Sequence, residues 1–412
     1  MSEAAAPECC VVGTGPAGLS AALALAAAGS EVALVGPRVE RQTSARDTRT
    51  AALFPGSVEF LRNLGVWEAV APESAPLRAI RIVDDTGRLL RGPEVLFEAH
   101  EIGLDAFGYN VPNAALSAAL QDAAANHHRV YTVETGAVTN VDIGDEQAAV
   151  RTTEGALVAA KLIVAADGRQ STCRSAAGIG TRSWAYEQSA IATSFAHRRP
   201  HDSVSTEFHR PAGPCTTVPL PGLSSSLVWV DRPAIAQRLT ELPVAEFQEA
   251  LEARLHGLLG TLAEIGPRRL FPLGGLTADR FGQNRVALVG ETGHVMPPIG
   301  AQGLNLSLRD AATLADCVAE ARRRGDDAGG PETLRRYHEA RQADVTSRSL
   351  VVDALNRTLI ADLLPVHLLR GAALHVVHAF APLKHALIDQ GLKPPGPLPR
   401  LMQPGGGGLL LR

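Results

Sequence analysis

The chain has 412 residues, 45% hydrophobic and 20% charged, so it can bury a sizeable core as a globular protein of one to three domains. The formal net charge of -4 comes without a basic block, which excludes nucleic acid as an electrostatic partner. The five cysteines form no C-x-x-C pair, so we expect neither a metal site nor a disulfide framework. Without a leader pattern or a run of about 18 apolar residues, we expect a cytoplasmic protein.

The N-terminal residues follow the pattern of a nucleotide-binding unit. Cys9–Val12 is a short apolar run that predicts a strand, and it leads into a glycine-rich turn at Gly13–Gly18. An Ala/Leu-rich helical stretch follows and should end at Ala28, because Gly29 can stop it. Glu31–Val35 predicts a second strand. This strand–turn–helix–strand order is the opening of a Rossmann-like fold.

Each glycine of the turn has a physical reason. Gly13 permits the tight turn, Gly15 lets the backbone approach a pyrophosphate, and Gly18 lets helix and strand pack closely. The helix that starts at Pro16 and Ala17 offers the positive end of its dipole to phosphates. By itself, the turn fits either a nucleotide site or a structural glycine turn.

One residue of the usual dinucleotide pattern is missing. An acidic side chain about 20 positions after the turn normally accepts the ribose hydroxyls. The second strand ends in Val35-Gly36-Pro37-Arg38, so Gly36 stands where that carboxylate would be. We therefore expect backbone groups or water to hold the adenosine ribose.

The rest of the chain alternates between buried strands, helices and one sheet-like region. Two more apolar strands run into glycine turns, Ala159–Ala166 before Asp167-Gly168 and Val286–Val289 before Gly290. Between them, Ser/Thr/Val-rich pieces separated by Pro and Gly from 189 to 232 predict an antiparallel sheet. We also expect helices at Asn113–Asn126, Pro243–Leu259, Leu304–Arg323 and 345–390 (with a break near Pro365), short strands in Val130–Val150, and an irregular tail at Lys393–Gly408.

Five stretches together carry a family resemblance. They are Gly13–Gly18, the A-D-G-x-x-S-x-x-R pattern at Ala166–Arg174, the stretch Gly290–Asn305, and the shorter matches Asp47–Leu53 and Gly396–Met402. In these motifs the chain resembles the class A flavoprotein monooxygenases, whose fold is that of p-hydroxybenzoate hydroxylase. Among them it looks most like the ubiquinone-biosynthesis hydroxylases. The resemblance spans nearly the whole chain.

The resemblance implies a mixed α/β (α+β) fold. It would consist of a Rossmann-like FAD-binding domain, an inserted antiparallel-sheet substrate domain and C-terminal helices. The implied boundaries are 1–80, 100–185 and 275–345 for the FAD-binding domain, 81–99 and 186–274 for the sheet domain, and 346–412 for the helical region and tail.

The implied activity is hydroxylation of an aromatic ring. NAD(P)H would act as a transient co-substrate that reduces FAD, since no second glycine-rich fingerprint follows a strand. O2 would add to the reduced flavin, and the resulting hydroperoxide would hydroxylate an electron-rich phenol, with or without a prenyl chain. The protein would position the ring and exclude water. A quinone-biosynthesis complex or the inner membrane face are further expected partners, and no substrate-side base can be named.

For several residues the resemblance implies a role in the flavin site, and an ordinary structural role is the alternative. Asp167 should lie where the cofactor and the nicotinamide meet, or it completes a strand-end turn with Gly168. Arg49 should reach the flavin, or it is a solvated surface charge. Asn113 supplies an amide near the flavin, or it caps its helix.

The other side of the site should come from the third motif. Gly290 and Glu291 should face the ribityl chain and pyrophosphate, and Pro298 should lie beside the isoalloxazine ring. Backbone N–H groups at Gly303 to Asn305 should stabilise negative charge on the reduced ring. The full implied cofactor-binding set is Gly13, Gly15, Pro16, Ala17, Gly18, Arg49, Asn113, Asp167, Gly168, Gly290, Glu291, Pro298, Gly300, Gln302, Gly303, Leu304 and Asn305.

Three departures from the family pattern bear on FAD affinity. Glu291 replaces the family's aspartate and adds a methylene, the Ala-Gly before Gln302 is reversed to Gly300-Ala301, and the ribose acid is absent at Gly36. We expect these departures to weaken FAD binding rather than to change the cofactor.

Alternatives remain for the substrate side. Phe208–Gly222 and Leu227–Trp229 resemble the family's substrate sheet, and they form either a wall of an apolar pocket or plain sheet core. The chain could also hydroxylate another aromatic metabolite, or be a non-catalytic flavin-binding subunit of a quinone-biosynthesis complex. A simple NAD(P)-dependent dehydrogenase would explain only the first motif.

Overall fold

The protein is described here by a computed structural model that covers residues 7–38, 47–87, 92–298, 300–360, 384 and 396–409. One part of the molecule is built on a six-stranded sheet. Its strands are β1 (Cys9–Val12), β2 (Val32–Gly36), β8 (Val130–Glu134), β12 (Leu162–Ala165), β19 (Gly282–Gln283) and β20 (Val286–Leu288). They lie in the order β19-β20-β12-β1-β2-β8, and all neighbours are parallel except β19 and β20.

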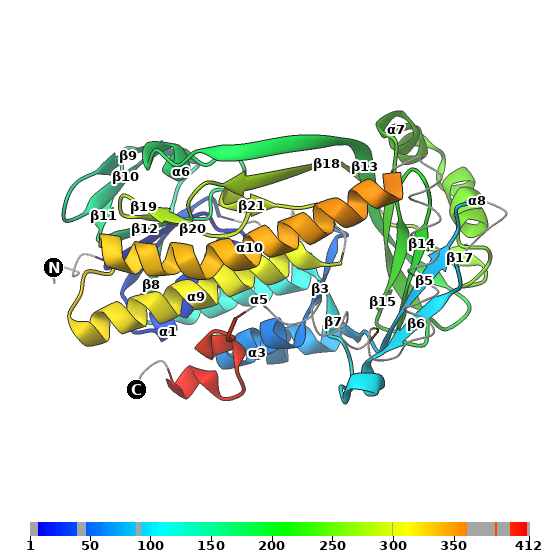
Figure 1. Cartoon of the computed structure of the whole chain (residues 1–412), viewed down its shortest axis with the longest axis horizontal. Helices are drawn as coiled ribbons and strands as arrows, with labels where there is room; N and C mark the ends of the chain where they lie inside the picture. Colours follow the sequence, from blue (N-terminus) through cyan, green and yellow to red (C-terminus); the bar gives the residue numbers. More distant parts are fainter. Residues whose placement is uncertain are drawn as a thin grey trace.

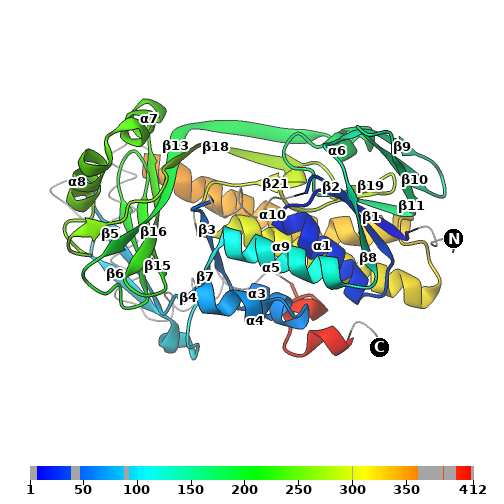
Figure 2. The same ribbon diagram turned by 180° about the vertical axis from the view of Figure 1, so that it is seen from behind.

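Both faces of this parallel sheet are covered, which explains why its strands are continuous apolar runs. The covering elements are helices α1 (Pro16–Ala27), α5 (Asn113–Asn126) and α9 (Gln302–Arg324) on one face, and strands β9 (Val138–Ile143), β10 (Ala148–Thr152) and β11 (Leu157–Ala160) on the other. Figure 2 shows the three helices side by side. Because successive strand side chains alternate, Val11 packs on the helices while Cys10 and Val12 pack on the small sheet.

A second, mostly antiparallel sheet forms the other part of the molecule. Its strands are β5 (Ala79–Asp84), β6 (Val95–Glu98), β13 (Thr181–His197), β14 (Val204–His209), β15 (Cys215–Leu220), β16 (Ser224–Asp231), β17 (Leu262–Ala263), β18 (Arg269–Ala278) and β21 (His294–Val295). The order is β21-β18-β13-β16-β15-β14-β5-β6, with β17 paired to β13. Figure 1 shows the long strand β13 running from one part of the molecule to the other.

The face of this sheet that is turned away from the parallel sheet carries two helices, α7 (Pro233–Glu241) and α8 (Val244–Arg254) (Figure 1). Phe208, Leu227 and Trp229 pack beneath them with Phe247 and Leu251 in one buried cluster. These apolar side chains bind the helices to the sheet. We call this the outer face and the opposite one the inner face.

Smaller elements connect the two parts. They are β3 (Thr50–Leu53), β4 (Ala75–Pro76), β7 (Tyr109–Pro112), α3 (Pro55–Asn63), α4 (Trp67–Val70), α6 (Thr172–Ala176) and the 3-10 turns η1 (Ala71–Glu73), η2 (Ala99–Ile102) and η3 (Gly290–Thr292). The hydroxyls of Thr50 on β3 and Ser226 on β16 are 2.8 Å apart, so β3 lies against the inner face. The Asn110 amide on β7 donates to the carbonyl of Pro219 at 2.8 Å.

The C-terminal elements run back over this framework. Helix α10 (Pro331–Ile360) packs along α9 and ends beside β13, where the Tyr186 hydroxyl donates to Asp353 at 2.6 Å (Figure 1). The turns η4 (Arg400–Met402) and η5 (Gly406–Leu409) dock on α3, where the Asn63 amide donates to the Leu401 carbonyl at 2.8 Å. No helix within the described ranges is long and apolar enough to cross a membrane.

The expected mixed α/β class is confirmed, with differences in detail. The single strand expected at 159–166 is two strands, because β11 pairs antiparallel with β10 and the chain then turns at Lys161 into β12 of the parallel sheet. The last described long helix begins at Pro331 rather than near 345, and the expected boundary at 345–346 falls inside it. The helices expected from 361 to 390 and the break at 365 lie outside the described residues, apart from residue 384.

Candidate flavin site

The three glycine motifs converge at the carboxyl ends of β1, β12 and β20. A side chain on Gly13 would place its Cβ 2.2 Å from the Ala166 carbonyl oxygen, and one on Gly18 would lie 1.9 Å from the Gly13 oxygen. A Cβ on Gly290 would lie 3.0 Å from that of Ala17. These contacts leave no space for side chains, so the glycines let the strand ends and α1 meet closely.

Other glycines of the motifs border free space instead. A Cβ added to Gly15, Gly168 or Gly303 would meet no atom of the described residues within 4 Å. Gly15 caps α1 at φ -74°, a conformation open to any residue, so the backbone itself does not require glycine there. The first turn of α1 carries no acidic side chain that would repel phosphate. The cradle therefore fits the pyrophosphate and flavin of FAD.

The structure gives a reason for the missing ribose acid. A Cβ on Gly36 would lie 3.0 Å from Cγ2 of Thr14 and 3.3 Å from its hydroxyl oxygen. The Thr14 hydroxyl itself donates to the Pro37 carbonyl at 2.7 Å. Thr14 thus packs closely against Gly36, and a side chain at position 36 would require Thr14 to shift. Holding the ribose by backbone groups or water is consistent with this packing.

Asp167 uses its carboxylate to build its own turn. One carboxylate oxygen accepts from the Ser171 hydroxyl at 2.6 Å, and the other from the Cys173 backbone N–H at 3.2 Å. The buried Arg174 then donates to the Thr292 carbonyl at 2.9 Å. Arg174 therefore ties the second motif to the third, a role that its place at the end of the A-D-G pattern signals but that sequence reasoning did not assign.

Arg49 and Asn113 lie together beside the inner face. Arg49 Nε donates to Asp47 at 2.8 Å, and the guanidinium stacks on the Phe271 ring with its carbon 5.1 Å from the ring centre. Burial alone would raise the pKa of the Asp47 carboxyl, but hydrogen bonds from Arg49 and from the Asn113 side chain outweigh this effect and lower the pKa. The cap residue of α5 is Pro112, so Asn113 supplies an amide to this cluster and does not cap its helix.

Glu291 turns toward the second motif. Its carboxylate pairs with Arg169 at 3.2 Å, and both side chains are about half exposed. Its charge also helps to raise the pKa of Arg49, after the larger contribution of the Asp47 hydrogen bond. The longer side chain thus lies among the basic residues around the cradle. The backbone N–H of Gly290 points inward and donates to Asp310 at 2.9 Å.

The loop before α9 has an unusual backbone. Gly300 and Ala301 both have positive φ, 63° and 54°, so the reversed Gly-Ala order places an alanine in the left-handed region. The side chain of Gln302 folds back, and its amide donates to the Gly300 carbonyl at 2.9 Å. Pro298 is exposed in the same loop. The first turn of α9, at Gln302, Gly303 and Leu304, carries no charged side chain.

The side chain of Asn305 forms hydrogen bonds within the protein and does not face open space. Its amide oxygen accepts from the Phe54 N–H at 2.9 Å and the Ser57 hydroxyl at 2.7 Å. Its amide nitrogen donates to the carbonyls of Ala52 at 2.8 Å and Ala301 at 2.6 Å. This buried residue locks β3, α3 and the start of α9 together.

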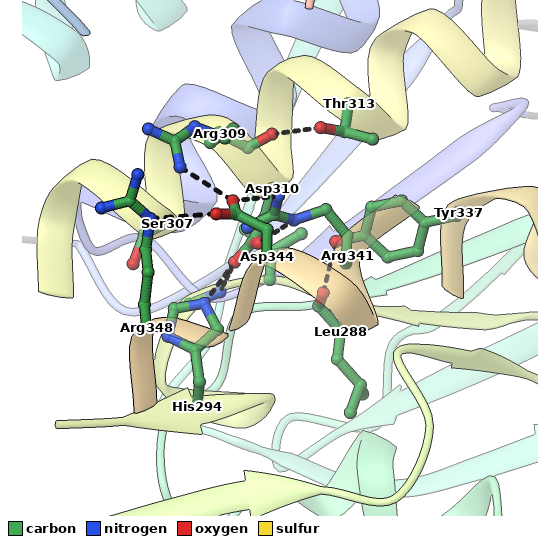
Figure 3. Close-up of polar contacts among 12 residues, drawn as sticks. Leu288, His294, Ser307, Arg309, Asp310, Thr313, Tyr337, Arg341, Asp344 and Arg348 are labelled. Carbon is green, nitrogen blue, oxygen red and sulfur yellow. Dashed lines mark hydrogen bonds and ion pairs between the residues drawn. The ribbon is translucent and has the colours of Figure 1, made fainter. Parts of the chain in front are cut away.

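Behind this loop lies a group of buried charges, which we call the ion cluster (Figure 3). Asp310 accepts from His294 Nε2 and from Arg341 Nε, both at 2.6 Å. Asp344 accepts from Arg341 and Arg309, both at 2.8 Å, and from Arg348 at 2.9 Å. The members of the ion cluster are His294, Arg309, Asp310, Arg341, Asp344 and Arg348.

Burial and pairing act in opposite directions on these groups. Burial alone would raise the pKa of Asp344, but the charges of Arg341 and Arg309 outweigh it and hold the pKa well below its usual value. The same opposition lowers the pKa of Asp310 through His294 and Arg341. The sequence analysis did not predict the cluster because half of it lies on α10, although Asp310 follows the third motif by only five residues.

One row of side chains on the inner face of the antiparallel sheet contains no aromatic residue. Strand pairing places Ala192, Val228, Thr216 and Glu207 in one row across β13, β16, β15 and β14. Alternation puts them opposite Phe208, Leu227 and Trp229, which are therefore plain sheet core beneath α7 and α8.

Among the residues of the segment expected to form a pocket wall, Thr216 and Val228 lie on the inner face and remain partly exposed. Glu207 continues their row on β14. Two positions further on the same strand, His209 Nε2 lies 2.7 Å from the Glu207 carboxylate, so this face also carries a titratable pair. Along this row the inner face therefore carries partly exposed apolar and polar side chains, and Thr216 and Val228 lie within the segments for which the sequence offered a pocket wall.

Solved structures with the same architecture define the class of protein. The p-nitrophenol 4-monooxygenase PnpA from Pseudomonas putida DLL-E4 superposes with a TM-score of 0.77 at 18% identity, covering 95% of this chain and 99% of that one. HpxO from Klebsiella pneumoniae, solved with FAD and uric acid, gives a TM-score of 0.72 at 19% identity, covering 94% and 97%. The fold is that of the flavoprotein monooxygenases.

Sequence comparison gives the family. Residues 7–349 match the family described as FAD binding domain, and the chain belongs to it. The ubiquinone hydroxylase UbiL of Rhodospirillum rubrum is 34% identical over 400 residues, 95% of this chain and 92% of that protein. The 3-demethoxyubiquinol 3-hydroxylase of Escherichia coli is 31% identical over 390 residues, 93% and 98%. The expected FAD cofactor and monooxygenase class are thereby confirmed.

Proposed function

We propose that this FAD-dependent monooxygenase hydroxylates the aromatic ring of a prenylated phenol in ubiquinone biosynthesis, using NAD(P)H and O2. The observation that carries the proposal is the similarity to a ubiquinone hydroxylase along 95% of this chain and 92% of the relative. In this proposal the glycine cradle would hold FAD, and the row of Ala192, Val228 and Thr216 on the inner face would receive the aromatic ring.

The implied cofactor residues keep their roles as part of this proposal. The pyrophosphate of FAD would lie over Gly15 and the start of α1, because a side chain there would project into open space. The flavin would lie between Gly303 at the start of α9 and the Arg49–Phe271 stack. Asp167 would act through the turn that it holds, since both carboxylate oxygens are engaged there.

Bound FAD would take electrons from NAD(P)H and use O2 to oxygenate the substrate. The chain's own residues would then have three tasks. The uncharged first turn of α9 would place its N–H groups against negative charge on the cofactor. Ala192, Thr216 and Val228 would hold the flat ring against the inner face and exclude water from it. Arg49, clamped by Asp47, would close the edge of the site beside Phe271.

A product assay tests this function. The purified protein, loaded with FAD, is supplied with NADH or NADPH and a short-chain 2-prenylphenol under isotopically labelled O2. We expect a hydroxylated product that carries one labelled oxygen. A protein that binds FAD and oxidises NAD(P)H only with a phenol that lacks a prenyl group would instead be a hydroxylase of another aromatic metabolite. A protein that binds FAD without oxidising NAD(P)H under any phenol would contradict the proposal.

The proposal extends to a site of action at the inner membrane face or in a quinone-biosynthesis complex. A prenylated phenol is lipid-soluble, so the enzyme must receive it from a membrane or a carrier. The exposed neighbours Leu350 and Val351 on α10 support such a contact, since their side chains are apolar and more than half exposed. Sedimentation with vesicles of anionic phospholipid tests it. Binding that is lost in a Leu350→Ser/Val351→Ser variant is expected, and absence of wild-type binding under any condition would leave a carrier protein as the source.

A further inference from the structure

A chain of hydrogen bonds joins the ion cluster to the loop before α9. Arg348 on α10 donates from Nε to Asp344 at 2.9 Å and from Nη1 to the side-chain oxygen of Gln302 at 2.7 Å. The Gln302 amide in turn donates to the Gly300 carbonyl at 2.9 Å. Arg348 and Gln302 are both buried, at 7% and 8% exposure. A guanidinium on one helix thereby fixes the conformation at the start of another.

Within the ion cluster the arginines outnumber the carboxylates. Three arginines (Arg309, Arg341 and Arg348) face two carboxylates (Asp310 and Asp344), before any charge on His294 is counted. Burial lowers the pKa of Arg309 but the carboxylates oppose this, and they raise the pKa of Arg341 above its usual value despite burial. Arginine stays protonated in proteins. The arginines of the cluster therefore keep their charge over the pH range in which the enzyme works.

Two buried donors of the cluster have no hydrogen-bond partner among the described residues. They are Nε of Arg309 and Nη2 of Arg341. Unpaired positive donors in a low-dielectric interior extend their field further than they would in water. Arg348 is the member of the cluster that reaches the loop, through Gln302 at the first position of α9.

We propose that Arg348 is a positioning residue that tunes the flavin. It fixes Gln302 and brings the positive charge of the ion cluster to the start of α9, where it favours the reduced, negatively charged cofactor. This inference rests on the placement of FAD proposed above. In this proposal the negative charge on the reduced cofactor is stabilised by a side chain of α10 as well as by the helix dipole of α9.

Reduction potentials of the bound flavin test the proposal. In Arg348→Met the side chain keeps its approximate volume and loses its charge, so we expect the ratio of reduced to oxidised flavin at a fixed ambient potential to fall about tenfold, or about 30 mV for this two-electron couple. Arg348→Lys keeps the charge, and its ratio should stay within about threefold of the wild type. Arg335→Met is the matched control, since Arg335 lies on the same helix but pairs only with Glu332 and Glu339 at the surface.

The outcomes separate the inference from the proposed site. Wild-type protein that does not bind FAD would defeat the placement of the cofactor. Normal FAD binding with an unchanged potential in Arg348→Met would overturn the role of Arg348 alone, and so would an Arg348→Lys potential as low as that of Arg348→Met. If Arg348→Met does not fold, Gln302→Met cuts the same link with the arginine intact. A potential equal to the wild type in that variant also contradicts the proposal.

Discussion

The two sheets of this enzyme differ in how far the polar side chains around them are buried and paired. Around the parallel sheet, buried charges such as Asp310 and Asp344 are fully enclosed and tied to arginines by several short hydrogen bonds. On the inner face of the antiparallel sheet, Thr216, Val228 and Glu207 are small or polar and remain partly exposed. In the first region the charged side chains are enclosed and held by one another, whereas in the second the side chains keep part of their surface accessible.

The difference teaches where specificity can change. A buried ion pair is costly to break because its partner is left unpaired, so the flavin side tolerates little substitution. A wall of partly exposed side chains loses little folding energy when one is exchanged. The cofactor side should therefore fix the chemistry, while the inner face sets the substrate. Four substitutions, ordered from the largest expected effect to the smallest, test this comparison.

Asp344→Asn should have the largest effect, on stability. It removes a carboxylate that accepts from Arg309, Arg341 and Arg348, and breaking such a buried pair costs about 3–5 kcal/mol. Urea unfolding of the purified proteins measures the loss. Glu339→Gln on the same helix, at an exposed ion pair, is the control and should show no resolvable change. An equal loss in both variants would remove the distinction between the enclosed and the open region.

The stability difference between the wild type and Asp344→Asn should also depend on pH. The folded-state pKa of Asp344 lies below that of the unfolded chain, so its stabilising contribution is complete above the unfolded value of about 3.9 and is lost as pH falls through the folded value. The stability difference between wild type and Asp344→Asn should thus be constant near neutral pH and shrink only in acid. A difference that already shrinks near neutral pH would contradict the low folded-state pKa of Asp344.

Gly15→Val should weaken FAD binding without unfolding the protein. The site has room for a side chain and an ordinary backbone conformation, but the valine would occupy the space of the pyrophosphate. We expect the FAD dissociation constant to rise roughly 30-fold, or about 2 kcal/mol, in fluorescence titrations. Gly18→Val is the contrasting variant, because its Cβ would lie 1.9 Å from the Gly13 oxygen and should disrupt folding itself. Tight FAD binding by Gly15→Val would place the pyrophosphate elsewhere.

Val228→Trp should change the substrate side only. The indole would stand out from the inner face and take the space of the ring, so we expect KM for a prenylphenol to rise about tenfold with FAD content unchanged. Its neighbour Trp229 faces α7 and α8, and Trp229→Ala should instead destabilise the fold by about 3–5 kcal/mol. Steady-state kinetics and thermal unfolding of both variants separate the two faces. An unchanged KM in Val228→Trp would mean that the ring does not bind on this wall.

Ala301→Gly should have the smallest effect. Ala301 has φ 54°, in the left-handed region that costs a non-glycine residue about 1 kcal/mol. Glycine removes that strain and restores the family's residue, so stability in urea should rise by roughly 1 kcal/mol or less. FAD retention on gel filtration should be equal or better. Weaker retention would show that the loop has adapted to the alanine.

The glycine positions of the candidate flavin site were predictable because they depend on local backbone geometry. Gly13, Gly18 and Gly290 stand where no side chain fits, and such positions leave a motif in the sequence. The role of Asn305 as a lock and that of Arg174 as a link were not predictable, since each depends on carbonyls or N–H groups from distant segments. Only the structure showed that Asn113 does not cap its helix, because the cap residue is Pro112.

By itself the sequence determined the class of fold, the cofactor and the family, because its motifs resemble those of the flavoprotein monooxygenases along nearly the whole chain. The tertiary structure alone decided which face of the antiparallel sheet is open, because strand register, not composition, separates Val228 from Leu227 and Trp229. It alone also revealed the ion cluster, since its charges come from α9, α10 and β21 and meet only when those elements pack. It further showed that a side chain at position 36 would crowd Thr14.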